Sequence, residues 1–448
     1  MIRGTRWLVL VGLAAACGAR EARAQEPASS QPAVDRDAQA SEARSSLTLE
    51  QVVRTALARN ERSRIAEIGI TSADAAVRKA RAGFLPTITL GATETLRPYS
   101  EQQNGRTTLR SNAMNGTLTV SQPLLAVSAF PAYSAAKHGA EAARWDAVDQ
   151  RRQLSFEAAK AFFAVIAAQR VLKAAERRQE RADASFADTR ARAEAQMVST
   201  NDVTRAQIER AKSVQSVVSA RSGLSTARVN LEYILDSSVE GELRAPEERL
   251  APPTLDIAQL TSRAMSDRPD IAAAREDVAA ASASADEPAM RAVPTLNVAG
   301  QARLADQQIA GDRHYDTTLT LNLSWQIWDA GSRGADTASR RAAADSKELQ
   351  ARALRRRVQA DVRAAVAVLQ GARVTLESAE QTVEAARRGA DETLVLYQQG
   401  LAKAIELVDA NLSRFDAEVS LAAAQLALRQ AELDLRDALG QFPIEGVK

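Results

Sequence analysis

Apolar and polar residues alternate along four short segments of the chain. In residues 318–327 every second residue is apolar, namely Leu319, Leu321, Leu323, Trp325 and Ile327. Residues 294–304 repeat this alternation, and similar patterns begin at Ile88 and Leu118. A period of two predicts β-strands with one apolar and one polar face. At roughly 9 to 12 residues, such strands could cross the hydrocarbon core of a membrane at a tilt.

The alternation alone leaves two interpretations open. A sheet with one face on a soluble core shows the same pattern as a sheet that faces lipid. Trp325 and Trp328 favour lipid, because they lie where an aromatic belt at the membrane interface is expected. If the strands face lipid, four of them cannot enclose a water-filled lumen, and open edges are not tolerated there. Several chains would then contribute strands to one barrel.

The rest of the pattern is helical. We expect helices over residues 49–82 and 257–287, each ending before the proline that opens a strand. Longer helical stretches cover residues 132–195, 201–235, 331–399 and 404–439. At 1.5 Å per residue the long helices would measure roughly 95 to 105 Å, and the two shorter helices of each half total about 105 Å. The short helices could therefore stack end to end beside a long one, in coiled-coil-like packing.

The pattern occurs twice. Pro86 and Pro294 each open a strand and lie 208 residues apart, and Ala206 and Ala410 correspond at 204. We divide the chain into a first repeat, residues 47–236, and a second repeat, residues 255–440, each with a helix, two strands and a long helical hairpin. Residues 237–254 are predicted to be an extended linker and residues 441–448 a tail. The predicted fold class is mainly α with a small β part.

The amino-terminal residues predict export. Arg3 and Arg6 precede an apolar stretch, and Ala22-Arg23-Ala24 offers small residues for cleavage, so residues 1–24 are predicted to be a signal peptide. Lipid modification of Cys17 is the alternative. Residues 25–46 are predicted to be disordered. No later run of about 18 apolar residues occurs, so we expect strands to make any membrane crossing.

Composition argues against an enzyme or a nucleic-acid-binding protein. The chain has 58 basic and 56 acidic residues, which gives no basic face for phosphates. One Cys and two His cannot form an intrachain disulfide or a Cys/His metal cluster, so we expect no metal and no cofactor. No nucleophile elbow or phosphate loop occurs, and His138 and His314 have no Ser or Cys partner in any motif.

Together these features resemble the TolC family of outer-membrane efflux proteins, the outer membrane factors. The resemblance covers residues 47–440 and rests on the duplicated unit and on several motifs: LTLEQVVRTALARN, ARAGFLPTITL, SWQIWDAGSRGADTASRRA at 324–342 and GLAKAIELVDANLSRFDAE at 400–418. It implies a homotrimer whose twelve strands form one transmembrane β-barrel in the outer membrane of a Gram-negative bacterium, continued by a periplasmic α-helical tunnel.

The resemblance also implies a function. The protein would be a passive exit duct of a tripartite efflux pump or a type I secretion system. A periplasmic adaptor, or membrane fusion protein, and an inner-membrane transporter would open it at its periplasmic tip. The alternative is a periplasmic coiled-coil adaptor or structural protein. The sequence does not identify the transported substrate.

The same resemblance implies two sets of site residues. The adaptor-contacting tip would comprise Gln196, Met197, Val198, Ser199, Gly400, Leu401 and Ala402. The periplasmic gate would comprise Asp202, Tyr397, Glu406 and Asp409. The chain departs from the family pattern at Gln196, where the family usually has Gly, and at Ala402, where some members have Arg.

Simpler interpretations of these residues remain open. Gly400 could be only a helix C-cap. Asp202 and Glu406 could be only acids favoured by the dipole of a helix's first turn. Glu406 and Asp409 share a helix face, and three copies of the pair would place six carboxylates in one narrow passage. Such a ring would bind cations and disfavour anions.

Overall fold

The computed structural model describes residues 47–103, 106–109, 111–239, 241, 243–244, 256–306 and 314–444. The predicted signal peptide, Cys17 and the predicted disordered segment lie outside the described residues, as do most of the predicted linker and the last four residues of the predicted tail. Side chains of residues 101–110 are likewise not described.

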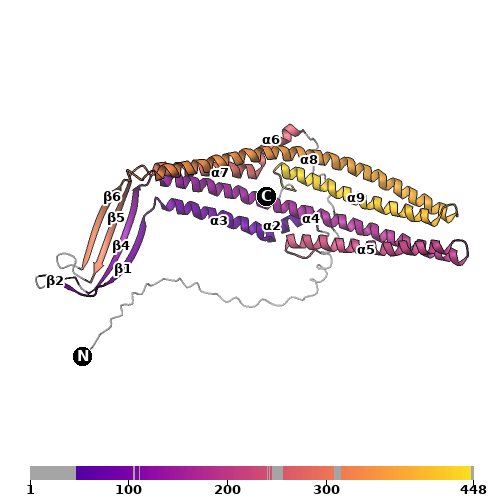
Figure 1. Cartoon of the computed structure of the whole chain (residues 1–448), viewed down its shortest axis with the longest axis horizontal. Helices are drawn as coiled ribbons and strands as arrows, with labels where there is room; N and C mark the ends of the chain where they lie inside the picture. The colour runs from indigo at the N-terminus through magenta and orange to yellow at the C-terminus, as the bar shows by residue number, and fades with distance from the viewer. Residues whose placement is uncertain are drawn as a thin grey trace, which may run out of the picture. The chain divides into compact units, whose positions relative to one another are not determined.

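The helices follow the predicted duplication (Figure 1). In the first repeat they are α2 Leu49–Arg59, α3 Glu61–Ala82, α4 Ala129–Glu194 and α5 Thr200–Leu235. In the second repeat they are α6 Ile257–Asp267, α7 Pro269–Met290, α8 Ser332–Gln398 and α9 Ala404–Ala438. The long helices α4 and α8, with 66 and 67 residues, begin and end within a few residues of the predicted bounds.

The prediction of one unbroken helix before each pair of strands is wrong. The helix is interrupted at Asn60, between α2 and α3, and the corresponding helix of the second repeat is interrupted at Arg268, between α6 and α7. Asn60 has an extended backbone, and its Oδ1 accepts a hydrogen bond from the Arg62 N–H at 3.0 Å, so it caps α3. Arg268 is extended because the ring of the following Pro269 disfavours the helical conformation before it.

Both breaks make the same tertiary contact. Asn60 Nδ2 donates to the carbonyl of Ile234, near the end of α5, at 3.0 Å. Arg268 Nη1 donates to the carbonyl of Ala438, at the end of α9, at 3.2 Å. Each bond satisfies a carbonyl that has no partner within its own helix. The two repeats therefore correspond in their hydrogen bonding as well as in their order of elements.

The helices pack side by side along α4 and α8. Near the sheet, α3, α4, α7 and α8 are successive neighbours, and towards the other end the order is α5, α4, α9 and α8. Figure 1 shows α3 and α5 following one another along α4, and α7 and α9 along α8. This is the stacking of two short helices beside one long helix that the sequence predicts. One edge of the array is formed by α3 and α5, and the other by α8.

Four antiparallel strands form one sheet in the order β1, β4, β5, β6. Their bounds are β1 Thr87–Leu96, β4 Asn112–Leu125, β5 Thr295–Ala305 and β6 Tyr315–Ser324. A separate short hairpin, β2 Glu101–Gln103 and β3 Arg106–Leu109, interrupts the first loop and was not expected. The predicted last strand extended to residue 327, but β6 ends at Ser324, so Trp325 and Ile327 lie beyond it.

The strand register gives the sheet two chemically different faces. One row across the sheet consists of Ile88, Val120, Gly300 and Leu319. The next row, one residue further along, consists of Thr89, Thr119, Gln301 and Thr318. Successive side chains of a strand point to opposite faces, so the first row belongs to an apolar face and the second to a polar one.

The hydrophobic core lies among the helices and not under the sheet. One cluster joins α2, α4 and α5 through Val52, Phe162 and Leu231, and a second joins α6, α8 and α9 through Leu260, Val362 and Leu435. Leu90 and Leu319 on the apolar face of the sheet are each 80 % exposed. Within the described part of the chain, the sheet therefore does not rest on a core of its own, contrary to the soluble-sheet interpretation.

Candidate functional site

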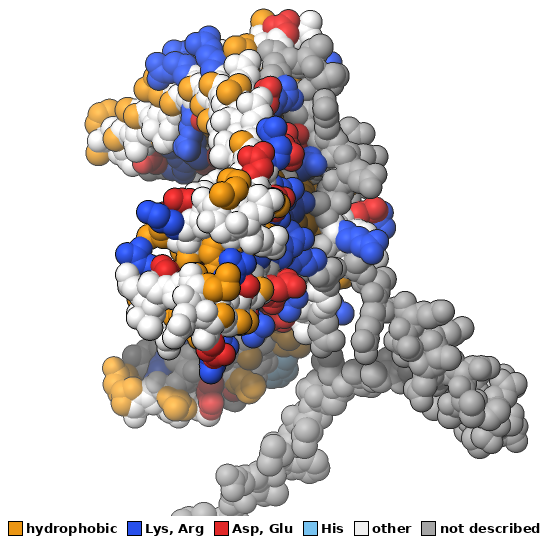
Figure 2. Space-filling model, turned by 90° about the vertical axis from the view of Figure 1, so that its right-hand side faces the viewer, with side chains coloured by type: hydrophobic (Ala, Val, Ile, Leu, Met, Phe, Trp, Pro, Cys, Tyr) orange, Lys and Arg blue, Asp and Glu red, His pale blue; other side chains and the backbone are white. Residues whose placement is uncertain are grey.

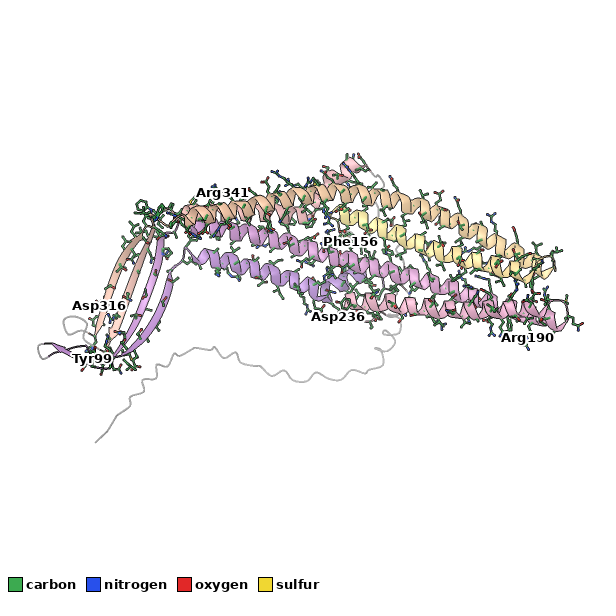
Figure 3. All side chains as sticks on the ribbon, in the orientation of Figure 1. Tyr99, Phe156, Arg190, Asp236, Asp316 and Arg341 are labelled. Atoms are coloured by element: carbon green, nitrogen blue, oxygen red, sulfur yellow. The ribbon has the colours of Figure 1, made fainter. Side chains whose placement is uncertain are left out.

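The apolar face of the sheet lies between two groups of exposed aromatic residues. Trp325 and Trp328 are exposed at the end nearest the helices, and Trp325 Nε1 donates to the carbonyl of Ala292 at 3.0 Å. Tyr99 and Tyr315 are exposed at the opposite end, which Tyr99 and Asp316 mark in Figure 3. Aromatic residues above and below a band of aliphatic side chains are typical of strands in a membrane.

The two turns between long and short helices have the same geometry. Gln196 and Gly400 both adopt the left-handed conformation, with φ of 60° and 76°. The next N–H bonds back to the carbonyl five residues earlier in each turn, from Met197 to Arg192 and from Leu401 to Leu396, at 2.8 Å in both. This is the hydrogen bond that closes a helix C-terminus after a left-handed residue. Gly400 is therefore a helix C-cap residue. Gln196 occupies the same capping position in the first repeat, although it is not glycine.

The first acid of each following helix also acts as a cap. Asp202 accepts hydrogen bonds from the backbone N–H and the hydroxyl of Ser199, at 3.3 and 2.8 Å. Glu406 accepts one from the backbone N–H of Lys403 at 3.3 Å. The helix-start interpretation thus accounts for both residues within one chain. Asp409, one turn further along α9, is exposed and makes no such contact.

Tyr397 joins α8 to α4 of the same chain. Its side chain is buried, with 4 % exposed, and its hydroxyl lies 3.1 Å from the hydroxyl of Thr189. The guanidinium of Arg192 lies 4.7 Å from the centre of its ring and donates to the Tyr397 carbonyl at 3.2 Å. Tyr397 therefore does not share a surface with Glu406 and Asp409 in a single chain. It connects the two helical hairpins just before their turns.

The turns themselves present exposed apolar side chains. Met197 and Leu401, which correspond in the two repeats, are 71 % and 73 % exposed. Figure 2 views the molecule from the side on which the turns lie in Figure 1, and shows basic, acidic and hydrophobic side chains mixed on this face. Large exposed apolar side chains at a tip are consistent with a protein contact there.

A cluster of buried charges lies further along the same hairpins. Arg178 of α4 donates twice to Glu209 of α5, at 2.8 and 2.9 Å, and stacks on Phe415 of α9. Glu418 of α9 is 7 % exposed and pairs with Arg387 and Arg414 at 3.4 and 3.5 Å.

Arg181 of α4 belongs to the same charged region. Burial, and then the positive charge of Arg414, lower the pKa of its guanidinium. No motif in the sequence marks these charged residues, because spacings of three and four along a helix equally describe a solvated surface.

Sites of other kinds receive no support from the described residues. No group of three or more His, Cys, Asp or Glu side chains among them is arranged to hold a metal ion. His138 pairs with Glu276 at 2.8 Å, and His314 contacts the carbonyl of Ala305. None of the described helices has the length and apolar character that a membrane span requires.

The sequence family described as outer membrane efflux protein matches residues 52–236 and 260–441, which are nearly the two repeats. The chain belongs to this family. It is an outer-membrane protein that provides an exit duct for efflux, as the resemblance to the TolC family predicts. The family favours this function over that of a periplasmic adaptor or structural protein.

Solved structures of outer-membrane channels share the fold. OprN is 23 % identical with a TM-score of 0.76, over 88 % of this chain and 90 % of that one. CmeC of Campylobacter jejuni is 15 % identical with a TM-score of 0.76, over 94 % of both chains. The open state of MtrE of Neisseria gonorrhoeae is 19 % identical with a TM-score of 0.75, over 88 % and 89 %. No curated protein matches the sequence significantly.

Proposed function

We propose that three copies of the chain close head to tail into one duct. The observation that carries this proposal is that, in the part of the chain that the structure describes, both the sheet and the helical array end in unpaired edges. In the sheet the edges are β1 and β6, and in the helical array they are α3 with α5 and α8. Unpaired strand edges are not tolerated in lipid, and a head-to-tail contact that repeats by rotation forms a ring. Three copies of the sheet give the twelve strands that the TolC family implies.

The assembled duct would cross the outer membrane as one β-barrel and continue through the periplasm as a tunnel of helices. The apolar face of the sheet would contact lipid, with Trp325 and Trp328 in the interfacial belt, and the polar face would line the lumen. Native mass spectrometry in a non-ionic detergent tests the assembly, with the mass of three chains as the expected result. A monomer that stays in solution without detergent would contradict it.

The end of the tunnel at the helical turns would be the gate. Tyr397 would keep it closed through its contacts with Thr189 and Arg192, because opening requires the α8–α9 hairpin to separate from α4. Tyr397→Phe and Thr189→Val each remove the hydroxyl pair and should increase the open fraction in planar-bilayer recordings. Tyr233→Phe is the control, since Tyr233 is 84 % exposed on α5. Equal recordings from all three variants would exclude the contact from the gate.

Glu406 and Asp409, with Asp202 nearby, would form the constriction once three copies meet. The variant Glu406→Gln/Asp409→Asn removes the charges while keeping groups that accept hydrogen bonds, and should weaken cation preference and cation block. Glu392→Gln neutralises another exposed acid near the same end and serves as a control. Unchanged selectivity in the double variant would remove the pair from the constriction.

The turns, Gln196, Met197, Val198 and Ser199 with Gly400, Leu401 and Ala402, would contact a periplasmic adaptor. An inner-membrane transporter of an efflux pump or type I secretion system would supply the energy, and the duct itself would be passive and would catalyse no reaction. Photo-crosslinkers placed at Met197 and Leu401 should capture a periplasmic protein in cells. A crosslinker at Leu349, which is 62 % exposed but lies closer to the sheet, should not.

A further inference from the structure

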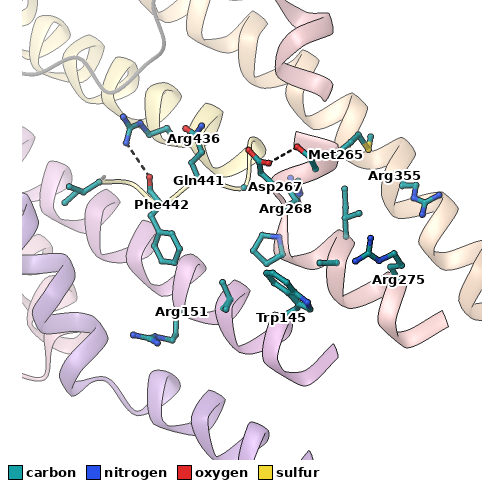
Figure 4. A pocket seen from close by; sticks show the side chains of 17 residues that line it. Trp145, Arg151, Met265, Asp267, Arg268, Arg275, Arg355, Arg436, Gln441 and Phe442 are labelled. Carbon is teal, nitrogen blue, oxygen red and sulfur yellow. Dashed lines mark hydrogen bonds between the residues drawn. The ribbon is translucent and has the colours of Figure 1, made fainter. Parts of the chain in front are cut away.

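A groove of about 1070 Å³ lies midway along the helices, where the break between α6 and α7 meets α4 and the chain that follows α9 (Figure 4). None of the gate, turn or membrane residues lines it. Trp145 of α4 and Phe442 reach into it from two sides, and Ile271 and Pro269 of α7 form part of its wall. Its size is comparable to the largest pockets that bind organic ligands.

The charged lining of the groove is almost entirely basic. Its ionisable residues are one acid, Asp267, and five bases, Arg151, Arg268, Arg275, Arg355 and Arg436. Two of the arginines are already engaged: Arg268 pairs with Asp270 at 2.6 Å, and Arg436 donates to the carbonyls of Phe442 and Pro443. These two hold the fold together at this place.

The other arginines retain unused donors. Arg275 is paired only loosely, with Glu276 at 3.8 Å, and its side chain is 70 % exposed. Arg151 and Arg355 have no ion pair or hydrogen bond with any residue that the structure describes. A guanidinium presents several donors in a planar fork that matches a carboxylate. The groove thus offers binding groups for an anion beside aromatic and aliphatic surfaces.

We propose that this groove binds an amphiphilic organic anion, one with a carboxylate head and an aromatic or aliphatic body. The head would lie beside Arg275 and Arg355, which line the same side of the groove, and the body would be directed towards Trp145 and Phe442 (Figure 4). The ligand could be an aromatic acid or a fatty acid, which share this chemistry. This site is separate from the proposed gate.

The edges through which copies of the chain would join contribute little to the groove. Its lining comes mainly from α4, α6, α7 and residues 440–444. Helices α3 and α5, which form one edge of the array, contribute no lining residue, and α8 contributes only Arg355. A neighbouring copy that joins through the edges would therefore not need to occupy this space.

The test is calorimetric titration of the full chain in a non-ionic detergent with naphthalene-2-carboxylate and with octanoate. Saturable binding of at least one is expected, and the matching neutral alcohols should bind at least tenfold more weakly. Binding of the aromatic acid alone or of octanoate alone would identify the source of the ligand, and either result supports the site. No saturable binding of either anion would overturn the proposal, as would equal binding of the alcohols.

Variants locate the binding in the groove. Arg275→Gln/Arg355→Gln should weaken binding about tenfold or more, because a charge-assisted contact of this kind accounts for at least one factor of ten. Arg356→Gln removes the next, exposed arginine of α8 and should leave binding unchanged. Channel conductance of the double variant should equal that of the unmodified protein, which shows that the duct is assembled. Unchanged affinity in a conducting double variant would overturn the proposal.

Discussion

Gln196 and Gly400 have the same backbone conformation at the ends of α4 and α8, although only one of them is glycine. A side chain in the left-handed region costs about 1 kcal/mol, because Cβ approaches a carbonyl oxygen. Gln196 is exposed, so packing of its side chain does not offset this cost. The chain therefore carries local strain at one turn and not at the other.

This difference leads to a paired prediction. Gln196→Gly should raise the free energy of unfolding of the protein in detergent by about 1 kcal/mol, and Gly400→Gln should lower it by about the same amount. Melting followed by circular dichroism measures both changes. A lower melting temperature for Gln196→Gly would show that the glutamine side chain contributes a contact within the assembled protein.

Gly440, just after α9, should be less tolerant of substitution. Its φ is +76°, and a Cβ at this position would lie 2.8 Å from Cα of Arg268. Gly440→Ala should therefore displace the break between α6 and α7 and lower the free energy of unfolding by roughly 3 kcal/mol. Gly223→Ala is the control: it lies in α5 with no atom within 4 Å, and should be stabilising by up to about 1 kcal/mol. A neutral Gly440→Ala would show that the contact relaxes easily.

The elements of this chain were predictable to different degrees. The long helices and the strands follow from periodicity, because α4, α8, β5 and β6 each repeat one pattern over many residues. The breaks at Asn60 and Arg268 were missed, since apolar residues continue on both sides of each and only the local cap and the proline end the helix. The sequence shows Gln196 in place of a glycine, but it does not show the conformation that this residue adopts.

The buried charges could not be predicted from the sequence. Glu418 on α9 pairs with Arg387 and Arg414 and interacts electrostatically with Arg181 only because α9 packs between α4 and α8. Residues 31 apart in the chain, such as Arg387 and Glu418, show no local pattern that would pair them. The same limit applies to Tyr397 and Thr189, which lie 208 residues apart. Contacts of this kind depend on which helices become neighbours.

Glu418 should therefore be necessary for the packing of α9. Glu418→Gln leaves the three arginines without their shared counter-charge, and should lower the free energy of unfolding by about 3 kcal/mol. Asp391→Asn, which removes an exposed partner of Arg414, should change it by less than about 1 kcal/mol. Chemical denaturation of the two variants in detergent makes the comparison. Equal stabilities would mean that water already screens the cluster.

At the scale of the whole molecule, the described sheet of a single chain has two edge strands, β1 and β6, that have no neighbour on one side. The polar row through Thr89, Thr119 and Gln301 runs across the sheet and stops at an unpaired strand on each side. The sequence shows that the strands have two faces, but their pairing order, β1–β4–β5–β6, comes only from the structure. That order joins the two repeats through β4 and β5, so each repeat contributes two neighbouring strands to the sheet.

The two faces of the sheet can be separated by two adjacent substitutions on β6. Leu321 lies on the apolar face, and Thr320 lies on the polar face next to it in sequence. An arginine on a lipid-facing strand costs about 2 to 4 kcal/mol near the middle of the bilayer, whereas an arginine that faces a water-filled lumen keeps its hydration.

Leu321→Arg should therefore reduce the amount of heat-modifiable protein in the outer-membrane fraction, while Thr320→Arg should assemble normally and shift the ion selectivity of the duct towards anions. Both variants add the same charge to the same strand, so a general effect of arginine on folding would reduce both equally. The reverse order, with Thr320→Arg failing and Leu321→Arg assembling, would show that the sheet presents its polar face to lipid, and the proposed duct would then be wrong at its central step.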